Sequence, residues 1–531
     1  MLKKTIIVLF ILLVLIKSQV SAEQGNSYYE SNPEELLFAD ITVASIKPMD
    51  IRETPGIVTV ITEDEIRNSG ARDLIDILRL VPGFEFGVDV FGVVGLGFRG
   101  NWAQEGKISL LWDGQEFADL LWSNLALGNH FPIDQIKQVE IIRGPGSVIY
   151  GGFAELAVIN VVTRKAGDIN GVNASVTYGQ MKNAAARKNI NISYGKVSGD
   201  DLNFVSSVFL GQGSQSDRQY TDFTGDTYNM SNNSELNPFN VNIGLECKGV
   251  NIRVLADRYN TTYKDDTAGA LVEPSNMNFD SYFFDLKYEY KLGNNLILTP
   301  RFNYKRQEPW KVPVPVTLLI DSSDSSSYQY DTTVERFTEN IMLSYDPAEK
   351  INIITGMEYY NDKARDNLNG TYSLAGKQEV NYSNFAGYLQ GIVNAPIVNI
   401  ITGARYENHS DYGTSFVPRI ALTKSFDRYH FKILRSNAFR PPSIEQIGVN
   451  KDIKPESTIV TEIEAGYQFS KKMFLTANVF DTILDKPIIY FADTVTGADN
   501  YVNFDKVITR GLELECKLKE KWGYLNMNYS F

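Results

Sequence analysis

The most constraining feature of the sequence is a repeated strand pattern that runs from residue 165 to residue 531. Segments of roughly ten residues alternate apolar and polar side chains, which is the pattern of strands in a transmembrane β-barrel. One face of each strand then meets lipid while the other faces a polar interior. Clear examples are the segments 203–210, 283–290, 298–304, 385–392, 398–406, 474–480 and 512–518.

The connections between these segments alternate in length. Short turns are predicted at 199–201, 248–249, 293–295, 347–350, 394–396, 427–428, 471–472 and 520–521. Long polar loops are predicted at 214–240, 261–280, 308–331, 363–381, 440–456 and 485–508. Short turns on one rim and long loops on the other are typical of outer-membrane barrels, whose long loops face the outside of the cell.

The beginning of the chain predicts export. Lys3 and Lys4 precede the apolar run 5–16, and Val20-Ser21-Ala22 offers the small residues that a signal peptidase reads, so residues 1–22 are interpreted as a signal peptide. The alternative is a membrane anchor, but about a dozen apolar residues are few for a bilayer core. An exported chain without a spanning helix is either soluble outside the inner membrane or a β-barrel.

Composition excludes several classes of function. A net charge of −13 argues against nucleic-acid binding, which needs a concentrated basic surface. The three histidines, His130, His409 and His430, are too scattered for a metal site, and no cofactor is expected. Cys247 and Cys516 could form a disulfide, but two isolated thiols fit their separate strands better. No nucleophile, base and orienting group occur at motif spacing, so no catalytic residue is assigned and the chain is not expected to be an enzyme.

Residues 38–164 predict a small mixed α/β domain. A strand over 57–62 ends at Thr62, which can cap a short helix over Glu65. A second helix fits 72–80 and is stopped by Val81-Pro82-Gly83.

The glycines between 95 and 100 match the dinucleotide fingerprint G-x-G-x-x-G. We reject that interpretation because no helical face follows, and 108–112 already forms a further strand that turns at Asp113-Gly114.

The stretch 139–164 combines a strand, a tight turn, a short bridging segment and a second strand. Pro145 fixes φ, while Gly144, Gly146, Gly151 and Gly152 allow positive φ or close backbone approach, so the shape of this loop is specified. Taken alone, the stretch is equally well explained as an ordinary buried hairpin.

A series of motifs runs in a fixed order along nearly the whole chain. The N-terminal motifs are the 41–45 island, 55–61, Val81-Pro82-Gly83, Phe98-Arg99-Gly100, Asp113-Gly114 and 143–164. The later motifs are 418–422, 437–443, Lys454-Pro455-Glu456 and Arg510-Gly511-Leu512-Glu513. Together these motifs resemble those of TonB-dependent outer-membrane receptors.

The resemblance implies a mainly β fold, in which an antiparallel transmembrane barrel of 22 strands holds an N-terminal α/β plug domain. The expected divisions are a signal peptide (1–22), a periplasmic segment with the TonB box (23–50), the plug (51–166) and the barrel (167–531). About 17 strands can be counted here, whereas single-chain bacterial barrels have an even number, so we expect a barrel truncated at its C-terminus. Against this, Leu525, Met527, Tyr529 and Phe531 alternate as in a terminal barrel-assembly signal.

The island at 41–45 has two interpretations. From its residues it is either the first strand of the next domain or an unpaired strand that adds to a partner's sheet. The resemblance favours the second and implies a TonB box, which pairs with TonB while ExbB and ExbD supply energy. Its residues are Ile41, Thr42, Val43, Ala44 and Ser45.

The resemblance also implies a receptor in the bacterial outer membrane, surrounded by lipid and expected to be monomeric. The plug-motif residues expected to be structural are Arg99, Gly100, Arg143, Gly144, Pro145, Tyr150, Gly151 and Asn160. Arg99 and Arg143 are expected to serve the plug structurally or to face barrel carboxylates.

The expected cargo of active uptake is a small metal chelate, first an iron siderophore, then cobalamin or another nutrient. Aromatic residues expected near the outer mouth of the barrel are Trp102, Trp112, Trp122 and Tyr220, and of these Trp102, Trp122 and Tyr220 are the candidate ligand contacts. Plug packing or a place at the membrane interface explains a Trp equally well. The other classes of function are a passive porin or adhesin and, more weakly, an outer-membrane enzyme.

Overall fold

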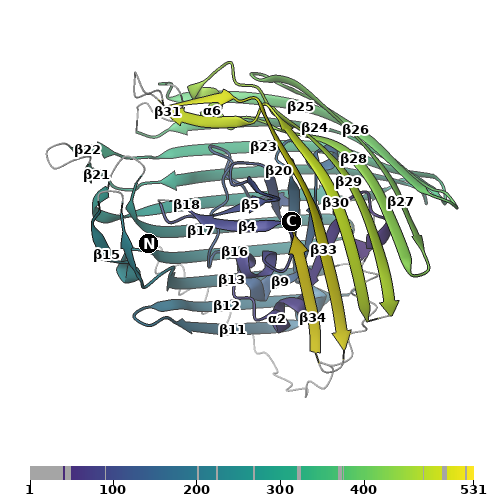
Figure 1. Ribbon diagram of the computed structural model, residues 1–531, viewed down its shortest axis with the longest axis horizontal. Helices are drawn as coiled ribbons and strands as arrows, with labels where there is room; N and C mark the ends of the chain where they lie inside the picture. Colours follow the sequence, from purple (N-terminus) through teal and green to yellow (C-terminus); the bar gives the residue numbers. More distant parts are fainter. Residues whose placement is uncertain are drawn as a thin grey trace.

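The computed structural model shows a large curved sheet wrapped around a small N-terminal domain (Figure 1). It describes residues 40–41, 43 and 49–531, except 90, 200–201, 223–224, 267–269, 320–324, 369–373, 375, 471, 493–498 and 521–522. The predicted signal peptide, residues 1–22, lies outside the described residues. Within them, no helix has both the length and the apolar character needed to cross a membrane.

The N-terminal domain, called the plug here, is built on a five-stranded sheet in the order β3-β9-β10-β7-β8, with a second sheet β4-β5-β6. Its elements are β1 (Asp40–Ile41), β2 (Met49–Asp50), η2 (Ile51–Glu53), β3 (Val58–Thr62), α2 (Glu63–Ser69), α3 (Leu74–Leu78), β4 (Phe84–Val88), β5 (Val94–Phe98), β6 (Asn101–Trp102), β7 (Ile108–Trp112), β8 (Gln115–Glu116), η3 (Ile133–Gln135), β9 (Ile136–Arg143), α4 (Ser147–Tyr150), β10 (Ala157–Thr163) and α5 (Ala166–Ile169).

Local sequence explains the plug helices. The Thr62 hydroxyl accepts a hydrogen bond from the Glu65 amide, and the Glu65 carboxylate accepts one from the Thr62 amide, so the predicted cap of α2 is a capping box. The apolar side chains of α3 are all buried, as its sequence predicts. No helix follows the glycines at 95 and 97, because the chain passes directly from β5 into β6.

The wall around the plug is one antiparallel sheet of 20 strands, three of which are short segments, β19 (Tyr290–Lys291), β21 (Val316–Leu319) and β22 (Ser325–Tyr328). The seventeen long strands are β11 (Gly171–Gln180), β12 (Ala185–Ser198), β13 (Leu202–Ser214), β16 (Glu235–Cys247), β17 (Val250–Asp265), β18 (Ala270–Tyr288), β20 (Leu296–Lys311), β23 (Thr332–Ala348), β24 (Ile351–Asp366), β25 (Glu379–Asn394), β26 (Asn399–His409), β27 (Gly413–Phe426), β28 (Tyr429–Arg440), β29 (Glu456–Ser470), β30 (Met473–Asp485), β33 (Lys506–Glu520) and β34 (Gly523–Ser530).

The predicted count of about seventeen strands is therefore confirmed. β11 and β34 form the two ends of the sheet, and no pairing joins them in the described part of the chain.

The wall has its polar face inside and its apolar face outside. In β25, Asn384 and Gln390 face the plug and are 1% exposed, whereas Phe385 and Leu389 face outward and are 47% and 54% exposed. This arrangement inverts the usual one for a soluble protein and places an apolar surface where a transmembrane barrel meets lipid.

Where the structure describes them, the predicted short turns fall between consecutive wall strands and define one rim, called the turn rim. The opposite loop rim carries β14 (Gln219–Thr221), β15 (Thr227–Asn229), η4 (Met230–Asn232), α6 (Ile444–Val449), β31 (Ile488–Ala492) and β32 (Asp499–Asn503), as well as β21 and β22.

The prediction of a long polar loop over 261–280 is wrong, because β17 runs to Asp265 and β18 begins at Ala270. Tyr263, Leu271 and Met277 continue the apolar packing there against Val93 of the plug, which extends the strands.

The main core of the plug is continuous with the wall. It joins Ile61, Leu110, Trp112, Ile141 and Ile159 of the plug to Leu255, Phe283 and Leu484 of the wall. Trp112 is 1% exposed and stacks on Phe131 inside this core, so its expected place near a ligand mouth is wrong.

Candidate functional site

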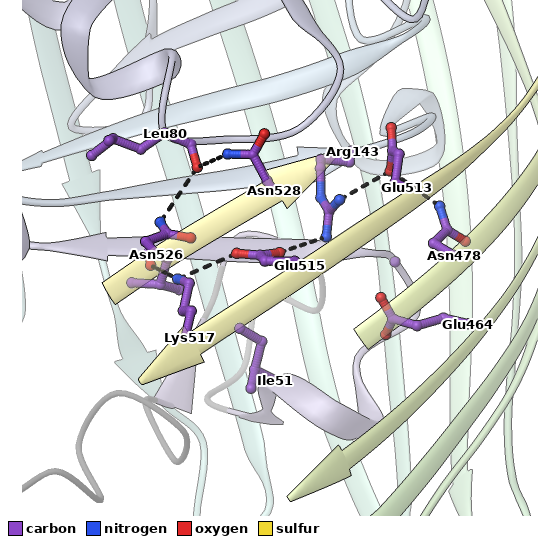
Figure 2. Close-up of polar contacts among 12 residues, drawn as sticks. Ile51, Leu80, Arg143, Glu464, Asn478, Glu513, Glu515, Lys517, Asn526 and Asn528 are labelled. Atoms are coloured by element: carbon purple, nitrogen blue, oxygen red, sulfur yellow. Dashed lines mark hydrogen bonds and ion pairs between the residues drawn. The ribbon is translucent and has the colours of Figure 1, made fainter. Parts of the chain in front are cut away.

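Five buried charges join the plug to strands β29 and β33, and we call them the arginine cluster: Arg99, Arg143, Glu462, Glu513 and Glu515. Arg99 donates to Glu513 at 2.8 Å and to Glu462 at 2.9 Å. Arg143 donates to Glu513 at 2.9 Å and to Glu515 at 3.2 Å (Figure 2). None of the five side chains is more than 10% exposed. Such charge-assisted hydrogen bonds are strong because little water competes for them.

The local backbone places these arginines against the wall. Arg99 and Gly100 both have positive φ, 50° and 72°, in the turn between β5 and β6, which aims the Arg99 side chain outward from the plug. Gly144, after β9, has a φ of 141°, and a Cβ at this position would lie 2.8 Å from a Glu462 oxygen. The positive φ favours glycine at this position, where the turn after Arg143 contacts the wall.

The same side of the plug carries polar contacts toward the turn rim. Asn526 and Asn528 of β34 donate to the Leu80 carbonyl at 3.4 and 3.0 Å (Figure 2). Lys517 of β33 donates to the Val60 carbonyl at 3.2 Å and lies 3.5 Å from Glu515. Strands β33 and β34 thus hold the plug by both charges and backbone carbonyls.

A second buried charge group lies toward the loop rim. Lys107 of the plug contacts Glu456 of β29, which also accepts from Arg440 of β28 at 2.8 Å. Thr458 donates to Glu155 of the plug at 2.5 Å. Burial and the nearby Glu456 raise the pKa of Glu155 to about 7, although Lys107 opposes the rise.

A cavity of about 540 Å³ lies on another side of the plug. Its plug side is formed by the β7–β8 turn, the α4 segment and β10, and its wall side by strands from β16 to β26. The wall residues that line it include Arg253, Asp285, Arg301, Asn303, Lys305, Arg336, Thr338, Glu358, Arg405 and Glu407. The cavity is therefore polar and carries charges of both signs.

Most charges of this cavity wall pair within the wall itself. Arg301 donates to Asp285 at 2.6 Å, and Arg336 donates to both oxygens of Asp362 at 2.6 and 2.7 Å. Arg405 pairs in the same way, with Glu407 on its own strand and Glu358 on β24. The plug contacts this wall through carbonyls, for example those of Gly114 and Ala118, which accept from Arg301 and Lys305 at 2.8 Å. Two plug carboxylates also contact it, Asp113 at Arg253 and Glu116 at 3.7 Å from Arg336.

The predicted TonB box is only partly described, because Thr42, Ala44 and Ser45 lie outside the described residues. Ile41 belongs to β1, which pairs with β2, so the expectation of an unpaired strand is wrong for this residue. Val43 is 1% exposed, and its carbonyl accepts a hydrogen bond from the Tyr150 hydroxyl at 2.7 Å. The box therefore begins docked on the plug, against the α4 segment.

The aromatic candidates divide into two groups. Trp122 lies 6.1 Å from Trp310 and 6.4 Å from Tyr330 between ring centroids, in an apolar cluster at the loop rim. Tyr220 lies in the β14–β15 hairpin, where its hydroxyl donates to Asp265 at 2.7 Å. Trp102 is 49% exposed on β6, and its ring lies against glycines of β4 and β5.

The remaining plug-motif residues have structural surroundings. Asn160 donates to Glu140 at 3.2 Å within the plug sheet. Gly151 has a φ of 76° and lies against Arg405 and Glu407 of the wall. Pro145 lies in the turn between β9 and α4.

The sequence did not identify Glu462 and Glu515 as wall partners of the plug arginines. It also did not predict that Arg440 pairs with Glu456. A signal was present, because Arg440, Glu456 and Glu513 all occur in barrel motifs. Glu462 and Glu515 could have been identified as charged residues at inward positions of strands with alternating polarity.

Among the described residues, no group of His, Cys, Asp or Glu is arranged to hold a metal ion, and both cysteines are free.

Comparison with known proteins gives the family of this architecture. Residues 50–157 match the model of the TonB-dependent receptor plug domain, and residues 160–531 match the TonB-dependent receptor-like β-barrel model. A vitamin B12 transporter of Vibrio vulnificus is 24% identical over 83% of this chain and 69% of its own length. The ferrienterobactin receptor of Escherichia coli is 22% identical over 87% of this chain and 73% of its own length.

Solved structures agree on the fold. A mutant form of the ferric enterobactin receptor of Pseudomonas aeruginosa superposes with a TM-score of 0.72 at 16% identity, covering 91% of this chain and 80% of that one. The siderophore receptor PirA of Acinetobacter baumannii gives 0.70 at the same identity and coverage. Proteins of this family are outer-membrane receptors and transporters that bind small molecules and interact with TonB. A plug anchored inside a barrel with a polar interior, matched by both family models, therefore makes this chain a member of the TonB-dependent receptors.

Proposed function

We propose that the chain is an outer-membrane transporter that takes up a metal chelate actively, with an iron siderophore as its cargo. The observation that carries the proposal is the buried arginine cluster, which fastens the plug inside the wall. A plug held in this way blocks diffusion, so passage needs energy from outside the barrel. A passive porin or an adhesin has no need of such a plug.

Energy enters at the N-terminal segment in this proposal. Residues 41–45 pair with TonB, which is driven by ExbB and ExbD, after ligand binding shifts the plug to a state that frees them. The docking of Val43 under Tyr150 supports a closed resting state of this segment. The receptor acts as a monomer, and its first 22 residues are a signal peptide removed on export. Its transport cycle needs no covalent chemistry.

The siderophore assignment draws on the names of relatives. Ferric enterobactin receptors of Pseudomonas aeruginosa and Escherichia coli are among them. Cobalamin is the second candidate, because a relative that matches 83% of the chain is a vitamin B12 transporter. Trp122 and Tyr220 at the loop rim are the proposed first contacts for either ligand, and Trp102 is a weaker one.

Uptake of two radiolabelled probes tests the proposal, ferric enterobactin and cobalamin. Cells that express the chain and lack their own receptors for both are compared with and without TonB. TonB-dependent accumulation of ferric enterobactin alone supports the siderophore assignment, and accumulation of cobalamin alone moves it to the second candidate. TonB-independent entry of both would indicate an open pore and refute active transport.

A further inference from the structure

Residues 51–56, between β2 and β3, are fastened to the wall, and we call this segment with its wall contacts the N-terminal clasp. At its centre lies Lys432 of β28, which is 1% exposed. The ammonium group of Lys432 donates to the Ile51 carbonyl at 2.8 Å, the Thr54 hydroxyl at 3.2 Å and the Gly56 carbonyl at 2.9 Å. A lysine ammonium has three N–H donors, so the segment offers an acceptor to each of them.

Glu53 forms the second half of the clasp. Its carboxylate accepts from the Asn399 side-chain amide of β26 at 2.8 Å, and from the backbone amide and hydroxyl of Ser425 of β27 at 3.1 and 2.6 Å. Its carbonyl accepts from the Thr423 hydroxyl at 2.8 Å. The next residues lead to Ile57, which is fully buried in an apolar cluster with side chains of β25 to β28. In these polar contacts the wall supplies the donors and the segment supplies the acceptors.

Release of the clasp would leave a buried charge behind in the wall. Among the described residues, Lys432 would keep Glu464, at 3.4 Å, as its remaining partner. A buried charge that loses its hydrogen-bond partners pays a desolvation penalty. The clasp is therefore held by the cost to the wall as well as by its own bonds.

The clasp lies just before the edge of the plug sheet. β3 is an edge strand and pairs only with β9, from Val58 to Thr62. Tension that arrives along the chain from residues 41–45 reaches residues 51–56 before it reaches β3. Without the clasp, this tension would act on the end of β3 and break its pairs one after another, beginning at Val58. With the clasp engaged, the tension passes into strands β26, β27 and β28 instead.

We propose that the N-terminal clasp is a load-bearing device that carries tension from the N-terminal segment into the wall. While the clasp holds, the pairing of β3 with β9 is unloaded and the plug stays closed. Release of the clasp exposes β3 to the tension, so the clasp sets the lowest force at which the plug begins to open. The source of the tension rests on the proposed function, in which TonB acts on residues 41–45, whereas the clasp itself is a property of the chain.

Single-molecule pulling tests the order of release. The full-length protein in phospholipid vesicles carries Cys247→Ser, Cys516→Ser and a pulling handle on Met49→Cys, just before the clasp. In this parent we expect release of residues 51–56 first, which lengthens the chain by about 20 Å, and then release of β3. Lys432→Met should lower the force of the first event and leave the force of the second unchanged.

The matched control is Lys472→Met. Lys472 lies in the β29–β30 turn and pairs with Glu520 of β33 at 2.7 Å, so its contact stays within the wall. Its loss should change neither force. The proposal is overturned by a first force that is the same in Lys432→Met and the parent, by an equal drop in Lys472→Met, or by release of β3 together with residues 51–56 in the parent.

Hydrogen exchange gives a second answer without applied force. If β3 opens through release of the clasp, its amides should exchange about tenfold faster in Lys432→Met, because the lost hydrogen bonds come from a charged donor. Amides of β10, in the middle of the same sheet, should be unaffected, which shows that the plug of the variant is folded. Unchanged exchange in β3, or an equal acceleration in β3 and β10, would refute the proposal.

Neither measurement needs cargo or TonB. If the chain takes up neither ferric enterobactin nor cobalamin, the proposed function fails, while the release forces and the exchange rates still decide whether the clasp bears load.

Discussion

Glu513 is the centre of the arginine cluster, and its neutralisation should loosen the plug more than any other single charge change on β33. It accepts three hydrogen bonds from Arg99 and Arg143 at 2.8 to 3.1 Å, and its side chain is 1% exposed. The substitution Glu513→Gln keeps the shape and one acceptor oxygen but removes the charge. Both arginines then remain buried with one fewer anion between them.

The magnitude follows from the partners that remain. Breaking a buried ion pair by removing one partner costs about 3–5 kcal/mol. Glu462 still pairs with Arg99 and Glu515 with Arg143, so the expected loss lies at the lower end, about 3 kcal/mol of plug-docking free energy. Since each 1.4 kcal/mol is a factor of ten, the undocked state should become roughly 100-fold more populated.

Hydrogen exchange measures this population directly. β5 ends just before Arg99, and β9 ends at Arg143. Backbone amides of these two strands should lose about 100-fold of protection in Glu513→Gln if they exchange through undocking. The matched control is Asp481→Asn, which breaks the exposed pair of Asp481 with Arg510 on the neighbouring strands β30 and β33, with side chains 41% and 71% exposed. That pair should be worth roughly 0–1 kcal/mol. Unchanged protection in Glu513→Gln, or an equal loss in Asp481→Asn, would refute the reasoning.

Three further predictions concern the N-terminal segment and the loop-rim charges. Tyr150→Phe removes the hydrogen bond to the Val43 carbonyl, worth about 1 kcal/mol, so limited proteolysis near Val43 should accelerate about fivefold, and an unchanged rate would show that the bond does not hold the segment. Ile41→Pro removes a backbone donor from the strand that pairs with TonB, so uptake should be lost while ligand binding to whole cells persists; loss of both or of neither would contradict the box assignment. The raised pKa of Glu155, about 7, means that the folded state holds this proton more tightly than the unfolded chain, so plug stability should fall as pH rises from about 5 to 8. Glu155→Gln should flatten that slope in thermal unfolding of the purified protein, and an unchanged slope would assign the pH dependence to other groups.

The wall could be predicted from sequence because each strand carries its own signal. In β25, residues 385 and 389 face out and residues 384 and 390 face in, a pattern with a period of two that needs no knowledge of neighbours. The loop-rim elements carry no such local signal. Residues 261–280 look like a polar loop in sequence, and only contacts such as that of Tyr263 with Phe91 of the plug reveal why they continue as strands.

Some residues of the candidate site could likewise be predicted from sequence, whereas others could not. Arg99 and Arg143 could be identified because they stand beside glycines and prolines with specified backbone shapes. The docking of Val43 under Tyr150 could not be predicted, because 107 residues separate the two and neither lies in a periodic pattern. The aromatic candidates were chosen by residue type alone, so Trp112, which is fully buried in the plug core, looked equivalent to Trp122 at the rim.

Charge pairing within the wall and charge pairing between plug and wall have different origins. Arg336 lies directly opposite Asp362 in the register of β23 and β24, and Arg405 and Glu407 are two residues apart on the same face of β26. These pairs therefore form as soon as neighbouring strands align, whether or not the plug is present. Arg99 and Glu513 are 414 residues apart and meet only when the plug is seated. Arg336 and Arg405 thus have carboxylate partners in the wall that do not depend on the plug, whereas Arg99 and Arg143 find theirs only at β29 and β33.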